Sequence, residues 1–275
     1  MKPSPTIILS LLIAGSATTL AADPSAEAPP SLLAAPPNQA RTHPPRNAGT
    51  DEAEYRRCMR LATTDPGAAK SLAAGWQAKG GGHPADHCFA VALIGLGRYR
   101  DAAGLLEKLA QAMVHAPTEL RAEVLGQGAQ AWLLAGEPGR AWAADEAALG
   151  LRPNDADLLV DQAEAAGAAG WFDKALGDLD RVLAADPARP DALIYRASAY
   201  RALSRLDDAA SDIDKALVAA PDSVAALLER GNIRSLKGEF DGAREDWQRV
   251  AKSAPGSPAA EAAKANLARL DNPAR

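Results

Sequence analysis

The sequence predicts an all-α protein built as a solenoid of helical hairpins. Hydrophobic residues make up 47% of the 275 residues but aromatic residues only 4%, so Ala, Leu and Val carry the apolar content. Small and straight-chain apolar residues favour closely packed helices over a β-sandwich. Prolines also recur at a fixed spacing of 34 residues, at Pro153, Pro187, Pro221 and Pro255. A period of this length is typical of a stacked structural repeat.

The composition argues against several other classes of protein. The formal net charge is -5, from 35 acidic and 30 basic residues, so the chain lacks the broad cationic surface that binds phosphates, and we expect no nucleic acid partner. Two cysteines can form one bridge, but they cannot build a disulfide-rich scaffold or a four-thiolate zinc site. The length corresponds to one or two domains of ordinary size.

The first 22 residues have the layout of a secretory signal peptide. One positive charge at Lys2 precedes an apolar run from Ile7 to Ala14, and small residues follow up to Ala21 and Ala22, where we expect cleavage. A membrane anchor is the alternative, but this run is well short of the roughly 20 apolar residues that span a bilayer. We therefore expect a periplasmic or secreted protein with no stable membrane insertion after signal cleavage.

Residues 23–50 have the composition of a disordered linker. Seven prolines lie among Ala, Ser and Asn in this segment, with no helical or alternating apolar period. Such a segment can also be a ligand for an aromatic-lined groove, but no PxxP register repeats in it. The linker interpretation is therefore favoured.

Beyond the prolines, small and apolar residues keep the same 34-residue period. The small residues recur in two series, Ala129, Ala163, Ala197 and Gly231, and Ala141, Ala175, Ala209 and Ala243. A third series is apolar and consists of Leu125, Leu159, Leu193 and Leu227. Three series with one period indicate a repeating structural unit rather than a coincidence of composition.

The unit between residues 190 and 220 predicts a helical hairpin. Leu193, Ala197 and Tyr200 share one face of a first helix, and a second apolar face starts at Ala209. Small residues at the contact points let the two helix axes approach closely. In four successive units the turn between the helices falls at Gly136, Gly170, Ser204 and Gly238.

These positions resemble the tetratricopeptide repeat (TPR), whose 34-residue unit has the pattern W-x2-L-G-x2-Y, then A-x3-F, then A and P. The frames of four units run over residues 122–155, 156–189, 190–223 and 224–257. Trp132 and Tyr200 stand at the aromatic position, while Leu179, Ile213 and Trp247 stand at the large apolar position. Three residues depart from the pattern: Ala166 and Arg234 at the aromatic position, and Asp145 at the large apolar position. The resemblance implies a right-handed superhelix whose first helices line a concave groove for peptides or partner proteins.

The chain on either side of these four units extends the predicted stack. Residues 83–121 hold a further TPR-like repeat, with about five residues inserted around Val114 to Arg121 as a longer loop. Residues 51–82 predict a degenerate N-terminal helical pair, and residues 258–275 predict a C-terminal capping helix. The resemblance therefore covers most of the mature chain.

The groove positions implied by the resemblance predict a partner-binding surface with an acidic middle. They are Glu123, Gln127, Gln130, Asp157, Asp161, Glu164, Asp191, Tyr195, Ser198, Arg201, Glu229, Asn232 and Ser235, with Ile194 beside them. The family's best-known peptide mode clamps a terminal carboxylate with Lys, Asn and Arg, and this mostly acidic or uncharged set disfavours it. We expect a neutral to basic partner segment, apolar contact from Ile194 and Tyr195, and weaker binding at raised salt. The alternative is that these charges are only a solvated helix face.

Two cysteines, Cys58 and Cys88, lie 30 residues apart on first helices expected in adjacent units. Export favours their oxidation, so we predict a disulfide that anchors the terminal unit. The alternative is a metal site in which His83 and His87 join Cys88 and Cys58. Pro84 disfavours it, because the proline fits the first residue of a helix with His83 as the flanking cap.

The sequence has no GxSxG, HExxH, phosphate-binding or dinucleotide-binding motif in the structural context that such a motif requires for catalysis or binding. The repeats and caps use up the chain, so we predict no enzyme activity, no cofactor and no metal. The predicted function is a protein- or peptide-binding TPR module in the bacterial cell envelope. Two alternatives stay open: a scaffold or assembly factor for an envelope complex that uses its convex face, and, more distantly, a cell-wall hydrolase.

Overall fold

The computed structural model of the chain describes residues 48–271, and the predicted signal peptide and nearly all of the predicted linker lie outside them. Within the described residues the chain forms thirteen α-helices and no strand, which confirms the predicted all-α class. The helices are α1 (Ala48–Thr64), α2 (Pro66–Ala78), α3 (Gly82–Gly95), α4 (Tyr99–Ala112), α5 (Thr118–Leu134), α6 (Pro138–Leu151), α7 (Ala156–Ala168), α8 (Phe172–Ala185), α9 (Pro190–Ala202), α10 (Leu206–Ala219), α11 (Val224–Leu236), α12 (Phe240–Ser253) and α13 (Pro258–Asp271).

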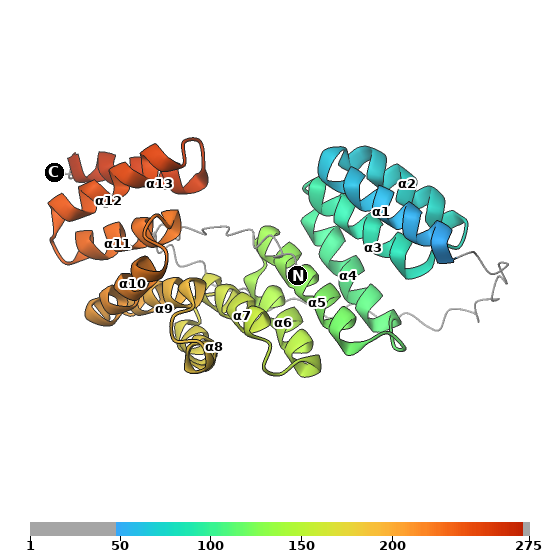
Figure 1. The fold of residues 1–275 in the computed structure, drawn as a ribbon, viewed down its shortest axis with the longest axis horizontal. Helices are drawn as coiled ribbons and strands as arrows, with labels where there is room; N and C mark the ends of the chain where they lie inside the picture. The colour runs from blue at the N-terminus through green and yellow to red at the C-terminus, as the bar shows by residue number, and fades with distance from the viewer. Residues whose placement is uncertain (1–47, 272–275) are drawn as a thin grey trace, which may run out of the picture.

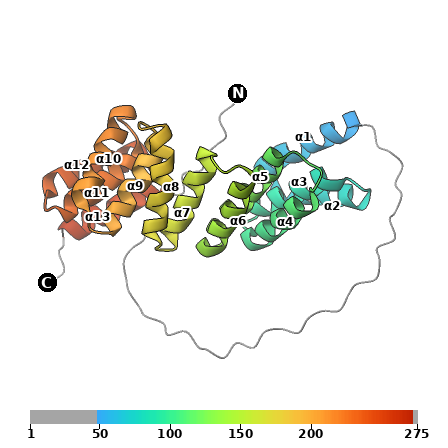
Figure 2. The same cartoon turned by 90° about the horizontal axis from the view of Figure 1, so that it is seen from below.

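Consecutive helices pair into hairpins, and the hairpins stack in chain order. Each second helix packs on its own first helix and on the first helix of the next pair, as α6 does with α5 and α7. First helices also contact one another along the stack from α5 to α11. Figure 1 shows the result as a curved rod that runs from α1 to α13, and Figure 2 shows the helices side by side from below. The predicted solenoid is therefore confirmed.

The turns inside the hairpins use a left-handed backbone conformation, which ends the first helix and reverses the chain. Gly136, Gly170 and Gly238 have φ of 74°, 77° and 82°, a region that glycine adopts without steric cost. Ser204 has the same role with φ of 60°, although it carries a side chain. The 34-residue period therefore predicted the positions of these turns correctly.

The core consists of the periodic small and large apolar residues. Ala163, Ala197 and Ala209 are buried, and the large apolar positions Leu179 and Ile213 are fully buried among them. Each hairpin buries this apolar stripe against the next one, so a single hairpin has no core of its own.

Two predicted boundaries are wrong. Helix α1 begins at Ala48, so the last three residues of the predicted linker are helical. The insertion placed around Val114 to Arg121 mostly lengthens a helix instead of a loop: α5 begins at Thr118 and gains one helical turn over α7, while the loop before it, at 113–117, is only one residue longer than the loop at 152–155. Pro117 fits the residue just before a helix, with φ of -50°, and Glu119 in the first turn favours the helix dipole.

Candidate partner-binding face

Helices α5, α7, α9 and α11 together form one face of the rod, which we call the first-helix face. The predicted groove residues lie on these four helices, and all of them except the buried Glu229 are at least partly accessible. Glu123, Gln127 and Gln130 lie on α5, Asp157, Asp161 and Glu164 on α7, Asp191, Ile194, Tyr195, Ser198 and Arg201 on α9, and Glu229, Asn232 and Ser235 on α11.

Side-chain bonds connect this face from helix to helix. Gln130 on α5 bonds Asp161 on α7, and the Tyr195 hydroxyl on α9 bonds Glu164 on α7. Further along, Arg201 Nε donates to Glu229 Oε1 at 2.6 Å and so joins α9 to α11. The structure therefore brings together predicted residues that are about 30 positions apart in the sequence.

Asn232 and Gln127 are engaged by other parts of the chain. Asn232 Oδ1 accepts from Trp247 Nε1 at 3.2 Å and from Asn266 Nδ2 at 2.9 Å, which ties it to the terminal helices α12 and α13. Gln127 Oε1 bonds His87 Nε2 at 2.6 Å, and His87 Nδ1 in turn bonds the Tyr55 hydroxyl at 2.8 Å. Sequence reasoning missed these links, because the 34-residue period shows which positions are equivalent but not which polar side chains bond one another.

Several acids on the face are neutralised by arginine. Arg189, just before α9, donates to Asp157 at 2.7 Å and to both oxygens of Asp191 at 2.8 and 2.9 Å. Burial acts to raise the pKa of Asp191, but the bonds and charge of Arg189 outweigh it and hold the pKa below its ordinary value. Glu229 has its own arginine in Arg201. These acids therefore offer little free charge to a partner.

Asp161 and Glu164 differ, because within residues 48–271 neither forms an ion pair with a basic side chain. Both are half-buried, one helical turn apart on α7. Burial, with Asp157 as the main like charge, raises the pKa of Asp161 to about 6, against the opposing effects of Gln130 and Arg189. Burial also raises the pKa of Glu164 to about 7, although the bond from Tyr195 opposes it. Asp161 and Glu164 are thus half-buried acids of the face without a counter-charge in the described part of the chain.

A third uncompensated carboxyl lies next to them inside the rod. Asp145 on α6 is fully buried, and neither of its oxygens has a hydrogen-bond partner among residues 48–271. Burial, and then the charges of Asp161, Glu164 and Asp178, raise its pKa well above the ordinary value. The departure of Asp145 from the repeat pattern was the only sequence signal for this group.

The cysteines form the predicted disulfide, which joins α1 to α3. Cys58 and Cys88 are fully buried, with Cα atoms 6.1 Å apart. Since both thiols are used in the bridge, they are not metal ligands, and His87 is held by Tyr55 and Gln127. No cluster of three or more His, Cys, Asp or Glu suited to a metal ion occurs in the described part of the chain.

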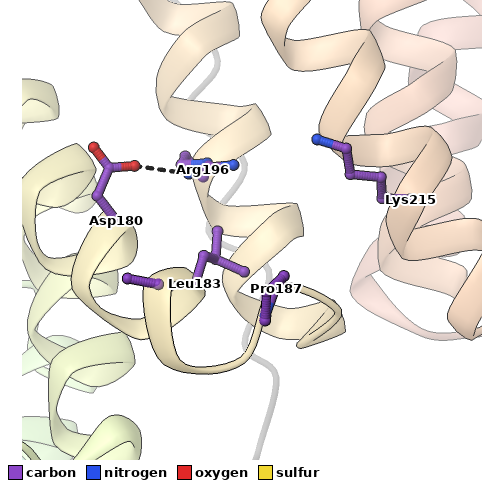
Figure 3. A pocket seen from close by; sticks show the side chains of 6 residues that line it. Asp180, Leu183, Pro187, Arg196 and Lys215 are labelled. Carbon is purple, nitrogen blue, oxygen red and sulfur yellow. Dashed lines mark hydrogen bonds and ion pairs between the residues drawn. The ribbon is translucent and has the colours of Figure 1, made fainter.

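A pocket of about 400 Å³ opens elsewhere, between α8, α9 and α10 (Figure 3). Asp180, Leu183, Pro187, Arg196 and Lys215 line it, together with Ala184. Its arginine is already engaged, since Arg196 donates to Asp180 and Asp212 at 2.7 Å each. The pocket charges are thus largely paired with one another.

Among residues 48–271, no helix combines the length and the apolar character that crossing a membrane demands.

Comparison with known proteins agrees with the fold and the period. The sequence model of the tetratricopeptide repeat matches residues 160–224 and 196–258. The chain is a tetratricopeptide repeat protein. No curated protein matches this TPR protein in sequence.

Several solved structures share the fold of this TPR protein. One is TTC0263, a thermophilic TPR protein of Thermus thermophilus, with 20% identity, a TM-score of 0.55, and coverage of 68% of this chain and 98% of that one. MamA of Desulfovibrio magneticus RS-1, from residue 41 to its end, has 21% identity, a TM-score of 0.53, and coverage of 64% and 97%. YrrB, described as a TPR protein with an unusual peptide-binding site, has 18% identity, a TM-score of 0.52, and coverage of 63% and 88%. At these identities the likeness establishes the fold, which is generally a non-catalytic scaffold for protein or peptide binding.

Proposed function

We propose that this TPR protein is a non-catalytic module that holds a neutral to basic peptide segment of a partner protein on its first-helix face. The observation that carries the proposal is the pair Asp161 and Glu164. They are half-buried on α7, and within residues 48–271 no basic side chain pairs with either, whereas Asp157, Asp191 and Glu229 have arginine partners. Desolvated carboxylates without a counter-charge favour a ligand that supplies one.

Apolar contact supports the same choice of surface. Ile194 and Tyr195 lie half-buried on α9, the next helix of the face, and Tyr195 is bonded to Glu164. An aromatic ring fixed by a hydrogen bond offers contact area at little cost in side-chain entropy. A segment that lies across α7 and α9 would meet both the charge and the apolar surface.

The bacterial envelope is the proposed location. The pattern of residues 1–22 is that of a secretory leader, and the Cys58–Cys88 bridge is of the kind that persists in oxidising compartments. Detection of the mature protein in a periplasmic fraction, with its N-terminus at residue 22 or 23, tests this part of the proposal.

The binding proposal is tested with labelled 12-residue peptides of graded net charge, measured by fluorescence anisotropy. We expect the basic peptides to bind most tightly and to weaken as salt rises. The variant Asp157→Asn, Asp161→Asn, Glu164→Gln should lose about tenfold or more in affinity.

A matched control removes the same number of charges from second helices. Asp173, Asp214 and Asp241 are exposed on α8, α10 and α12, and their change to Asn should leave affinity within about twofold. If the control triple lost affinity and the face triple kept it, a scaffold that uses the opposite surface would replace this proposal.

A further inference from the structure

Asp145 stands where the other hairpins have a large apolar side chain. The equivalent residues in the next three hairpins are Leu179, Ile213 and Trp247, at steps of 34 residues, and all three are buried. All three belong to one continuous cluster of buried apolar residues. Aspartate is shorter than any of these side chains, so α6 presents a carboxyl group to α7 in place of an apolar filler.

This carboxyl has no partner within the described part of the chain. Both oxygens of Asp145 are buried without a hydrogen bond, and the charges that raise its pKa are the acids Asp161 and Glu164 on α7 and Asp178 on α8. Burying an unpaired carboxyl next to other carboxyls is unfavourable, and an apolar residue of similar volume would serve packing better. Packing alone therefore does not explain an aspartate at this position.

Asp145, Asp161 and Glu164 together form what we call the acidic notch. Asp161 and Glu164 are three residues apart on one helix, so a single ligand group can touch both from the solvent side of the face. Asp145 lies on the interior side, where burial favours its neutral form and a cation bound in the notch would favour its ionised form. A metal ion does not suit it, since no such cluster among residues 48–271 has the arrangement that a metal needs.

Arginines neutralise the acids on either side of the notch but not the notch itself. Arg189 is bonded to Asp157 and Asp191, and Arg201 is bonded to Glu229. Tyr195 and Gln130 supply only neutral hydrogen bonds to the notch. The missing positive charge is therefore left for a ligand to bring.

We propose that the acidic notch binds the ammonium group of a lysine side chain in the bound segment, with Asp161 and Glu164 in contact and Asp145 as the buried carboxyl behind them. This rests on the proposed function, because it assumes a segment on the first-helix face. Lysine fits better than arginine, since its compact ammonium group has three donors at the end of a slender apolar stem, which suits carboxyls approached from one side.

The experiment uses 11-residue peptides of Ala, Gln and Ser that differ only at the central position, which is Lys, Arg or norleucine. Norleucine keeps the apolar stem of lysine and lacks the charge. For the full mature protein we expect the lysine peptide to bind about tenfold more tightly than the norleucine peptide. Equal affinities for the two, or a preference for arginine of more than threefold over lysine, would overturn the proposal.

The variant Asp145→Leu separates a ligand role from a structural one. It restores the residue type of Leu179, so the fold should be retained and should unfold at higher urea concentration. The preference for lysine over norleucine should nevertheless fall to about threefold or less. The matched control Asp173→Asn removes an exposed acid from the second helix α8, away from the first-helix face, and it should keep the full preference. An unchanged preference in Asp145→Leu contradicts the proposal.

A second measurement does not depend on peptide binding. n-Butylammonium, which copies the end of a lysine side chain, is titrated against protein with carbon-13 in its carboxyl groups, with n-butanol as the neutral control. A saturable shift of the Glu164 and Asp161 carboxyl signals with the ammonium alone is expected, and no shift overturns the notch. A shift without binding of any peptide would instead refute the proposed function while the notch stands.

Discussion

Arg196 and Asp212 form a two-bond ion pair within one hairpin. Arg196 Nε donates to Asp212 Oδ2 at 2.7 Å and Nη2 donates to Oδ1 at 3.0 Å. In the next hairpin, 34 residues later, Arg230 and Asp246 repeat the arrangement with 2.8 and 2.6 Å. The period of the fold thus includes a fork-shaped charge pair between the first and second helix, in addition to the apolar positions.

The preceding hairpin has the aspartate of this pair but lacks the arginine. Asp178 stands 34 residues before Asp212, while Gln162 stands at the arginine position. With its amide oriented to suit both neighbours, Gln162 donates to Asp178 at 3.2 Å and accepts from the Glu146 backbone N–H at 3.2 Å. Burial raises the pKa of Asp178 even though Arg181 and Lys174 oppose it. A basic side chain at position 162 would therefore lie next to the carboxyl group of Asp178.

We predict that Gln162→Arg stabilises the protein. The new guanidinium would meet Asp178 as Arg196 meets Asp212, and Glu146 would stand in the place of Asp180. An increase of about 1 kcal/mol in the free energy of unfolding is expected for a charge-assisted pair of this kind, measured by urea denaturation. Gln162→Met, which keeps the length without the charge, is the control, and an Arg variant less stable than the Met variant would contradict the prediction.

We predict that Ser204→Gly also stabilises the protein. Ser204 is the non-glycine residue with positive φ among residues 48–271, and its φ of 60° imposes a steric cost that glycine avoids. The gain should be about 0.5 to 1 kcal/mol by thermal or urea unfolding. Ser211→Gly, at an exposed position inside α10, is the matched control, and its free energy of unfolding should fall by a similar amount. A loss of stability in both variants would argue against strain at the turn.

Gly231 and Trp247 are predicted to be energetically coupled. A Cβ atom added at Gly231 would lie 2.5 Å from Trp247 Nε1 and 2.7 Å from its Cδ1, closer than packed atoms allow. Gly231→Ala should therefore destabilise the protein by about 1 to 3 kcal/mol. In the two preceding hairpins alanine at this position is combined with Leu179 or Ile213 at the position of Trp247, so adding Trp247→Leu should recover about 1 kcal/mol or more. Additive losses in the double variant would show that the two residues do not compete for space.

Removing the disulfide should loosen the N-terminal end of the rod. Cys58 and Cys88 close a 30-residue loop that ties α1 to α3, and the chain-entropy model assigns such a loop about 3 to 4 kcal/mol. The double Cys→Ala variant should show faster amide hydrogen exchange in α1 and α2, while exchange in α9 to α12 stays unchanged. Equal exchange in α1 with and without the bridge would mean that packing alone holds this helix.

The sequence was sufficient for the features that repeat. The positions of Ala197, Ala209 and Ile213 recur every 34 residues, with small residues at the first two and mostly large apolar residues at the third, so one frame places them all. The features that the sequence did not predict depend on contacts that occur only once in the stack. The bond between His87 and Gln127 joins two irregular hairpins, and the extra turn of α5 depends on how Pro117 starts that helix. The lack of a partner for Asp145 requires coordinates, because a sequence shows which residue is unusual but not what surrounds it.

The pH dependence of stability should reflect Glu164. Burial raises the pKa of this carboxyl from 4.5 to about 7 in the folded protein. Between these two values the folded state keeps a proton that the unfolded state has already released. The free energy of unfolding therefore falls as the pH rises from about 4.5 to about 7, and Asp161, with a pKa of about 6, acts in the same direction from pH 3.8 upward.

We therefore expect Glu164→Gln to be more stable than the wild type at pH 8, by about 2 to 3 kcal/mol, and to differ much less from it at pH 4.5. Glutamine keeps an oxygen for the Tyr195 hydroxyl, so the change isolates the charge from the hydrogen bond. Urea unfolding at pH 4.5, 6, 7 and 8 measures the difference, and Glu123→Gln, at an exposed position on α5, should stay within about 0.5 kcal/mol of the wild type throughout. Parallel pH profiles for Glu164→Gln and the wild type would mean that this carboxyl ionises as readily in the folded protein as in the unfolded chain. The uncompensated charge on the first-helix face would then be ordinary surface charge.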